Sequence, residues 1–201
     1  MILIDGQKSD LDVANFQNLD QIFVMMNEAG LLKDRVVTDV FLNDEPFSEI
    51  YPHQAEDIET SEVTSVEVRT MPVGEVAVEI TRELYKVVSL IGEGASRVAE
   101  LFRQADDAEA LETYQDLLDV TRDFVGMVGT LRSEFSLTDH KEFMEASEQF
   151  NTLFTEMSEV LLNEDWILLA DLLEYEYIPA VNRWKTVVAL LREDVRASGR
   201  E

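Results

Sequence analysis

Residues 138–161 read TDHKEFMEASEQFNTLFTEMSEVL, and large apolar side chains recur along them every three or four positions. The positions on this face, in a 4-3-4-3-4 spacing, are Phe143, Ser147, Phe150, Phe154, Met157 and Leu161, and all but Ser147 are large and apolar. This spacing puts one face of an α-helix against a core and the other in water. The stretch therefore predicts an amphipathic helix that begins at Thr138 or Asp139 and packs against other helices.

The same period predicts further helices on both sides of this stretch, over residues 75–103, 107–134 and from about 165 onward. The predicted core positions of the second and last of the four helices are Leu111, Tyr114, Leu118, Val125 and Val128, then Leu169, Leu173, Tyr177, Val181, Trp184, Val188, Leu191 and Val195. Links of two or three residues make consecutive helices antiparallel. Residues 75–201 are thus predicted to form an antiparallel four-helix bundle. Pro179 is expected to kink the last helix near Tyr175, or to split it in two.

The first 71 residues have a different pattern, with short β-branched runs and turn residues. Asp5-Gly6 suits the positive φ angles of a tight hairpin turn. The predicted elements are strands at 2–4 and 11–16, a helix at 19–29, and strands at 36–42 and 63–70. This order resembles a ubiquitin-like β-grasp module, and the resemblance implies that the first and last strands pair in parallel.

The module boundary is expected at residues 71–74, where proline and glycine occur and the hydrophobic period changes. The predicted domains are a small β-grasp-like α+β module over residues 1–71 and the helical bundle over residues 75–201. The predicted fold class is therefore α+β, mainly α overall.

The chain is strongly acidic, with 42 aspartates and glutamates, 16 lysines and arginines, and a formal net charge of −26. Such a charge repels nucleic-acid phosphates and anionic membranes, and it favours a protein partner with a basic surface. The absence of cysteine excludes disulfides and thiolate sites. The first residues lack the pattern of a signal peptide, and no apolar stretch is long enough to span a membrane, so a cytoplasmic location is expected.

No catalytic, metal or cofactor motif is recognisable, so neither an enzyme nor a cofactor is predicted. The carboxylates of Asp171, Glu174 and Glu176 flank the expected irregularity at Pro179 and are the candidate carboxylate site. The loop at residues 46–52 is the most apolar predicted loop, and its Phe47, Ile50 and Tyr51 either fold back onto the sheet or form an exposed patch for partner contact.

Three readings of the function follow from these observations. The first is a non-enzymatic interaction, adaptor or chaperone-like protein, with a homodimer as an open alternative. The second is a small-ligand or metal-binding protein, or an enzyme, with a carboxylate site near the irregular last helix. The third is an acidic DNA mimic. A buried carboxylate with a raised pKa would favour the second reading.

Overall fold

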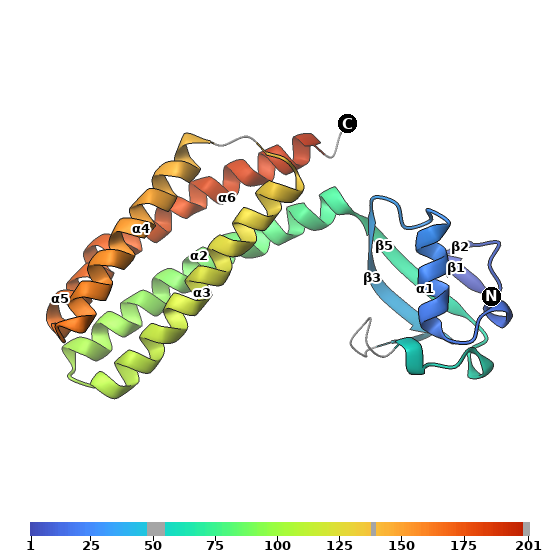
Figure 1. Cartoon of the computed structure of the whole chain (residues 1–201), viewed down its shortest axis with the longest axis horizontal. Coiled ribbons are helices and arrows are strands. Elements are labelled where there is room, and N and C mark those ends of the chain that lie inside the picture. Colours follow the sequence, from blue (N-terminus) through green and yellow to red (C-terminus); the bar gives the residue numbers. More distant parts are fainter. Residues whose placement is uncertain (48–54, 138–139, 199–201) are drawn as a thin grey trace. The chain divides into compact units, whose positions relative to one another are not determined.

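A computed structural model describes residues 1–47, 55–137 and 140–198 (Figure 1). The chain divides into two compact units, Met1–Val76 and Ala77–Glu201. The first unit is a small mixed α+β unit and the second is helical, which confirms the predicted fold class, mainly α with an N-terminal β module. None of the helices in the described part of the chain is long and apolar enough to cross a membrane.

The N-terminal unit is a five-stranded sheet with one helix packed on a face (Figure 1). Its elements are β1 (Ile2–Ile4), β2 (Gln7–Lys8), α1 (Leu19–Glu28), β3 (Arg35–Leu42), β4 (Glu45–Pro46) and β5 (Val66–Pro72). The strand order is β2-β1-β5-β3-β4, and β1 pairs with β5 in parallel while the other pairs are antiparallel. The parallel first and last strands agree with the expectation from the β-grasp resemblance.

The Asp5-Gly6 turn lies where the sequence predicts it, with φ values of 50° and 76°. The Asp5 carboxylate accepts hydrogen bonds from the backbone N–H of Thr70 at 2.7 Å and from Arg35 Nη2 at 3.0 Å. The bond from the Thr70 N–H lowers the pKa of Asp5, and Arg35 acts in the same direction. The turn is therefore tied to the central strand β5 by its own first residue.

Two details of the sheet differ from the sequence prediction. The return strand is Gln7–Lys8, directly after the turn, whereas the predicted strand at 11–16 contains a 3₁₀ turn at Val13–Asn15, capped by Asp12. In β3, a register shift between Val37 and Asp39 breaks the alternation of faces, so Val36 is exposed.

The C-terminal unit is a helical bundle. Its elements are α2 (Val73–Arg103), whose first turn contains the unit boundary, α3 (Asp107–Glu134), α4 (Lys141–Leu162), α5 (Trp166–Leu172), the π-helical turn η4 (Leu173–Tyr177) and α6 (Ile178–Ser198). All eight predicted core positions of the last helix are buried. The helices bury side chains at alternating spacings of three and four, the pattern of left-handed bundle packing.

The buried faces of α3 and α4 are rotated slightly from the predicted ones. In α3 the buried positions are Ala110, Tyr114, Leu117, Thr121, Phe124, Val128, Leu131 and Arg132, and in α4 they are Ala146, Phe150, Leu153, Met157 and Val160. Leu111, predicted to be buried, is exposed. Leu118 and Val125 on α3, and Ser147 on α4, lie beside the core rather than within it.

The irregularity at Pro179 takes the form of a π turn. In η4 the backbone N–H of Ile178 donates to the carbonyl of Leu173, five residues back. Proline has no N–H to continue an α-helical ladder, and a π turn immediately before it re-registers the helix. Leu173 and Tyr177, at the two ends of the turn, are both fully buried.

Candidate functional site

The candidate carboxylates near Pro179 are partly or fully exposed, and two of them are paired. Asp171 accepts a hydrogen bond from Arg103 Nη2 at 2.8 Å, and Glu174 accepts one from Arg103 Nη1. Both bonds raise the pKa of the Arg103 guanidinium, and the bond to Asp171 has the larger effect. Glu176 is exposed and stands apart from this cluster. The structure thus brings Asp171 and Glu174 together as an ion-pair clamp between the end of α2 and the α5–η4 segment.

The described residues contain no group of three or more histidine, aspartate or glutamate side chains that could hold a metal ion. The candidate contact residue Phe47 is partly buried against the core of the N-terminal unit, and its backbone N–H donates to the carbonyl of Val40 at 2.8 Å. Ile50 and Tyr51 lie outside the described residues.

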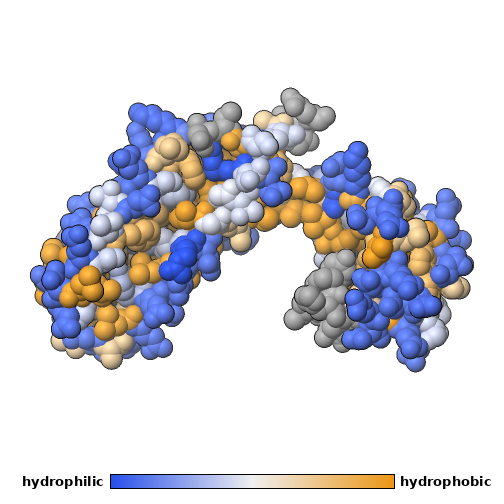
Figure 2. Space-filling view, in the orientation of Figure 1, coloured by the Kyte–Doolittle hydropathy of each residue, from blue (hydrophilic) through white to orange (hydrophobic). Residues whose placement is uncertain are grey.

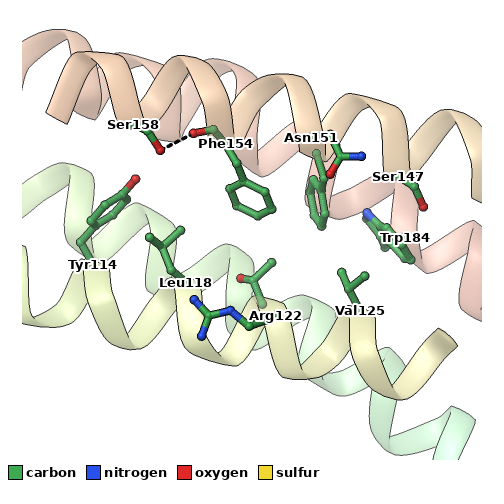
Figure 3. Close-up of a pocket in the computed structure, with 11 residues that line it drawn as sticks. Tyr114, Leu118, Arg122, Val125, Ser147, Asn151, Phe154, Ser158 and Trp184 are labelled. Atoms are coloured by element: carbon green, nitrogen blue, oxygen red, sulfur yellow. Dashed lines mark hydrogen bonds between the residues drawn. The ribbon is translucent and has the colours of Figure 1, made fainter. Parts of the chain in front are cut away.

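A cavity opens on the bundle between α3 and α4, with a volume of about 360 Å³ (Figure 3). Its apolar lining includes Leu118 and Val125 from α3 and Phe150 and Phe154 from α4, while Trp184 of α6 also lines it. All five of these residues are core positions in the prediction from the sequence. The rotation of α3 turns its second apolar stripe, with Leu118 and Val125, toward the cavity, whereas the predicted Tyr114, Val128, Phe150 and Met157 are true core positions.

Two polar atoms of the cavity lining are buried without a hydrogen-bond partner. They are the indole Nε1 of Trp184 and the Oγ of Ser147. Trp184 is fully buried, and the close-up shows its nitrogen turned into the space between α3 and α4 (Figure 3). Buried donors are almost always paired in folded proteins, so an unpaired indole N–H at a cavity wall indicates a place for an acceptor.

Two buried tyrosines lie in or next to the cavity lining, Tyr114 directly and Tyr177 through its contact with the lining residue Thr121. Tyr114 lines it directly, and burial raises the pKa of its hydroxyl to about 12. Tyr177 contacts Thr121 through its hydroxyl at 2.5 Å, and burial raises its pKa still further. Thr121 donates its own proton to the carbonyl of Leu117 at 2.7 Å, so Tyr177 must be the donor to Thr121. Both tyrosine hydroxyls therefore remain protonated donors at neutral pH.

The Thr121–Tyr177 bond supports a first prediction. In Thr121→Val the buried hydroxyl of Tyr177 loses its acceptor, so the free energy of unfolding should fall by about 1–3 kcal/mol. In the double variant Thr121→Val, Tyr177→Phe the orphaned hydroxyl is gone, so the loss should be smaller than the sum of the two single losses. Urea denaturation of the full chain, followed by circular dichroism, measures all four proteins. Strictly additive losses would contradict the pairing.

An exposed apolar cluster lies at the end of the bundle that holds the link between α4 and α5. Leu162, Ile167 and Leu168 are 84%, 58% and 44% exposed. Figure 2 shows apolar side chains gathered at the end of the bundle where α5 lies in Figure 1. We call these three residues the end cluster. Exposed leucine and isoleucine side chains in contiguous groups are typical of contact surfaces.

The end cluster lies in a stretch of chain without a single basic residue. Between Lys141 and Arg183 there is no lysine, arginine or histidine. The same stretch contains ten acidic residues: Glu142, Glu145, Glu148, Glu156, Glu159, Glu164, Asp165, Asp171, Glu174 and Glu176. The net charge of −26 does not reveal this local asymmetry, but a count of charges along the sequence does.

The fold and these sites define a class: a helical bundle with an interhelical cavity and an acidic, partly apolar surface, preceded by a β-grasp-like unit. Residues 79–187 match the family described as "Domain of unknown function (DUF8042)", and residues 1–71 match "Domain of unknown function (DUF8043)". Since the first match covers more than half of the chain, the protein belongs to the DUF8042 family. No curated protein and no solved structure matches the chain. Every residue that lines the cavity lies within residues 79–187.

Proposed function

We propose that the protein is a non-enzymatic interaction protein, adaptor- or chaperone-like, whose bundle binds a partner segment with apolar side chains flanked by lysine or arginine. The end cluster is the contact surface. The observation that carries the proposal is the position of Leu162, the most exposed large apolar side chain among the described residues, within the acidic stretch that has no basic residue.

Apolar burial and electrostatic attraction both favour binding of such a partner at the end cluster. Burial of exposed leucine and isoleucine side chains against a partner supplies affinity, at roughly 25 cal/mol per Å² of apolar surface removed from water. Carboxylates around the cluster, such as Glu159, Glu164 and Asp165, attract a basic partner, accelerate the encounter and disfavour acidic proteins. Neither of the two matched family descriptions names a catalytic activity.

Photo-crosslinking in the cells that naturally make the protein tests this proposal. A photoreactive phenylalanine derivative replaces Leu162 in one variant and Leu90, on α2 and also exposed, in a control. The expected result is a protein adduct at position 162 and none at position 90. The crosslinked peptide should contain apolar residues with basic neighbours, and its sequence identifies the partner.

The affinity of that peptide for the purified full chain gives the second readout. Leu162→Ser combined with Ile167→Ser should weaken binding by at least about tenfold, since two anchor side chains are lost, whereas Leu90→Ser should leave it unchanged. Added salt should weaken binding to the unsubstituted chain. Equal adducts at both positions, or an acidic peptide at position 162, would speak against the proposal.

A further inference from the structure

We propose that the cavity between α3 and α4 binds a neutral, mainly apolar small molecule whose carbonyl-type oxygen accepts a hydrogen bond from the indole Nε1 of Trp184. This site is separate from the end cluster, and it adds a small-molecule ligand to a protein proposed to bind a protein partner.

The size and lining of the cavity fit a small organic molecule. Its volume of about 360 Å³ lies within the range of about 300–1,000 Å³ that small-molecule sites occupy. The rings of Phe150, Phe154 and Tyr114 and the side chains of Leu118 and Val125 supply most of the wall. An apolar molecule would therefore leave water on entry and contact aromatic faces and edges.

The polar atoms of the cavity favour a ligand that carries a hydrogen-bond acceptor. The indole Nε1 of Trp184 can only donate, and it has no partner although the side chain is fully buried. The Oγ of Ser147 is likewise buried and unpaired, and it lines the same cavity. A ligand oxygen, as in a ketone, ester or amide, can accept from the indole N–H of Trp184. Pairing removes the cost of leaving a buried donor unsatisfied.

The charges around the cavity favour a neutral ligand over an ionic one. Among the described residues that line the cavity, Arg122 is the basic one, and its Nη1 already binds the carboxylate of Asp119 at 2.7 Å. Within the same described lining there is no aspartate or glutamate that could pair with a cation. An anion would also meet the field of a chain with a net charge of −26, and the acid-rich residues 142–182 include the whole α4 wall.

The test uses three matched probes on the ¹⁵N-labelled full chain. The first is the neutral aromatic ketone 6-propionyl-2-(dimethylamino)naphthalene, the second its 6-propyl analogue without the oxygen, and the third its 6-carboxylate analogue. The chain has two tryptophans, Trp166 and Trp184, so two indole N–H signals are expected. The variant Trp184→Phe assigns them by removing one.

The expected result is saturable binding of the ketone with a downfield shift of the Trp184 indole proton and no shift at Trp166. The propyl and carboxylate probes should bind at least about tenfold more weakly, because one lacks the acceptor and the other carries a repelled charge. Val125→Trp fills the cavity mouth and should abolish ketone binding, whereas the matched control Val120→Trp, on an exposed position of the same helix, should not.

Several outcomes would overturn the proposal. No saturable ketone binding up to the solubility limit would indicate that water satisfies Trp184 and Ser147. Binding that leaves the Trp184 signal unmoved, or that survives Val125→Trp, would place the probe elsewhere. Tighter binding of the carboxylate probe would assign the site to an anion instead. Chemical denaturation of both valine variants verifies that they are folded, and Ser147→Ala offers a milder change that should weaken ketone binding without filling the cavity.

Discussion

Replacement of Trp184 by alanine should lower the free energy of unfolding of the helical bundle by about 3–5 kcal/mol, the range for buried large aromatic residues. The indole is fully buried, and its ring centre lies 5.4 Å from that of Phe124, 5.9 Å from that of Phe143 and 5.3 Å from that of Phe150. Its removal opens a void that joins the existing cavity and leaves three aromatic rings without a shared neighbour. Urea denaturation of the full chain, followed by circular dichroism, measures the loss.

The matched control for this substitution is Tyr175→Ala, which removes an exposed aromatic side chain two residues from the buried Tyr177. Exposed substitutions of this kind usually change stability by less than about 0.5 kcal/mol. A loss below about 1 kcal/mol in Trp184→Ala would mean that α3 and α4 close over the vacated space, and that the cavity walls are not rigid.

Helical periodicity predicts the bundle well because burial in a helix repeats with a fixed spacing. The last helix is the clearest case, since all its predicted core positions, from Leu169 to Val195, are buried. In α3 the prediction is less accurate, because Leu117 and Phe124 form one apolar stripe and Leu118 and Val125 form a second stripe one residue away. Sequence alone does not say which stripe meets the core, since this depends on how far the neighbouring helices are rotated.

The candidate site depends on that rotation and is harder to predict. Trp184 is predicted to be a core residue, and it is one, but its unpaired Nε1 is visible only when α3 and α4 are placed beside it. The sequence does contain a sign of a polar site within the bundle, because Ser147 and Thr121 are polar residues among the apolar positions of their helices. Thr121 has a buried partner in Tyr177 and Ser147 has none, and only the structure separates these two cases.

In the N-terminal sheet, prediction from the sequence fails for a different reason. The strands and the turn at Asp5-Gly6 follow from local residue preferences, and the parallel pairing of β1 with β5 follows from the order of elements. The short return strand Gln7–Lys8 and the register shift after Val37 have weak local signals. The return strand pairs only with the neighbouring β1, whereas the register shift arises in the pairing of β3 with β5, whose residues lie far along the chain.

Replacement of Ile22 by alanine should destabilise the N-terminal unit by about 2–5 kcal/mol. Ile22 lies on α1, is fully buried, and belongs to a core that also contains Ile2, Val66 and Val68 of the parallel strands. The core of the helical unit is a separate cluster of residues. We therefore propose that residues 1–71 and 75–201 are separate domains, and the effect of the substitution should remain within the first.

Hydrogen exchange of the full chain, measured by mass spectrometry of its peptides, distinguishes the two units. In Ile22→Ala, amides of β1, α1 and β5 should exchange faster, whereas those of α3 and α6 should keep their rates, because local opening follows the unit that has lost its packing. The control Val24→Ala, an exposed position of the same helix, should change neither set. Faster exchange of α3 and α6 in Ile22→Ala would show that the two cores unfold as one cooperative unit, and the division into two domains would then be wrong.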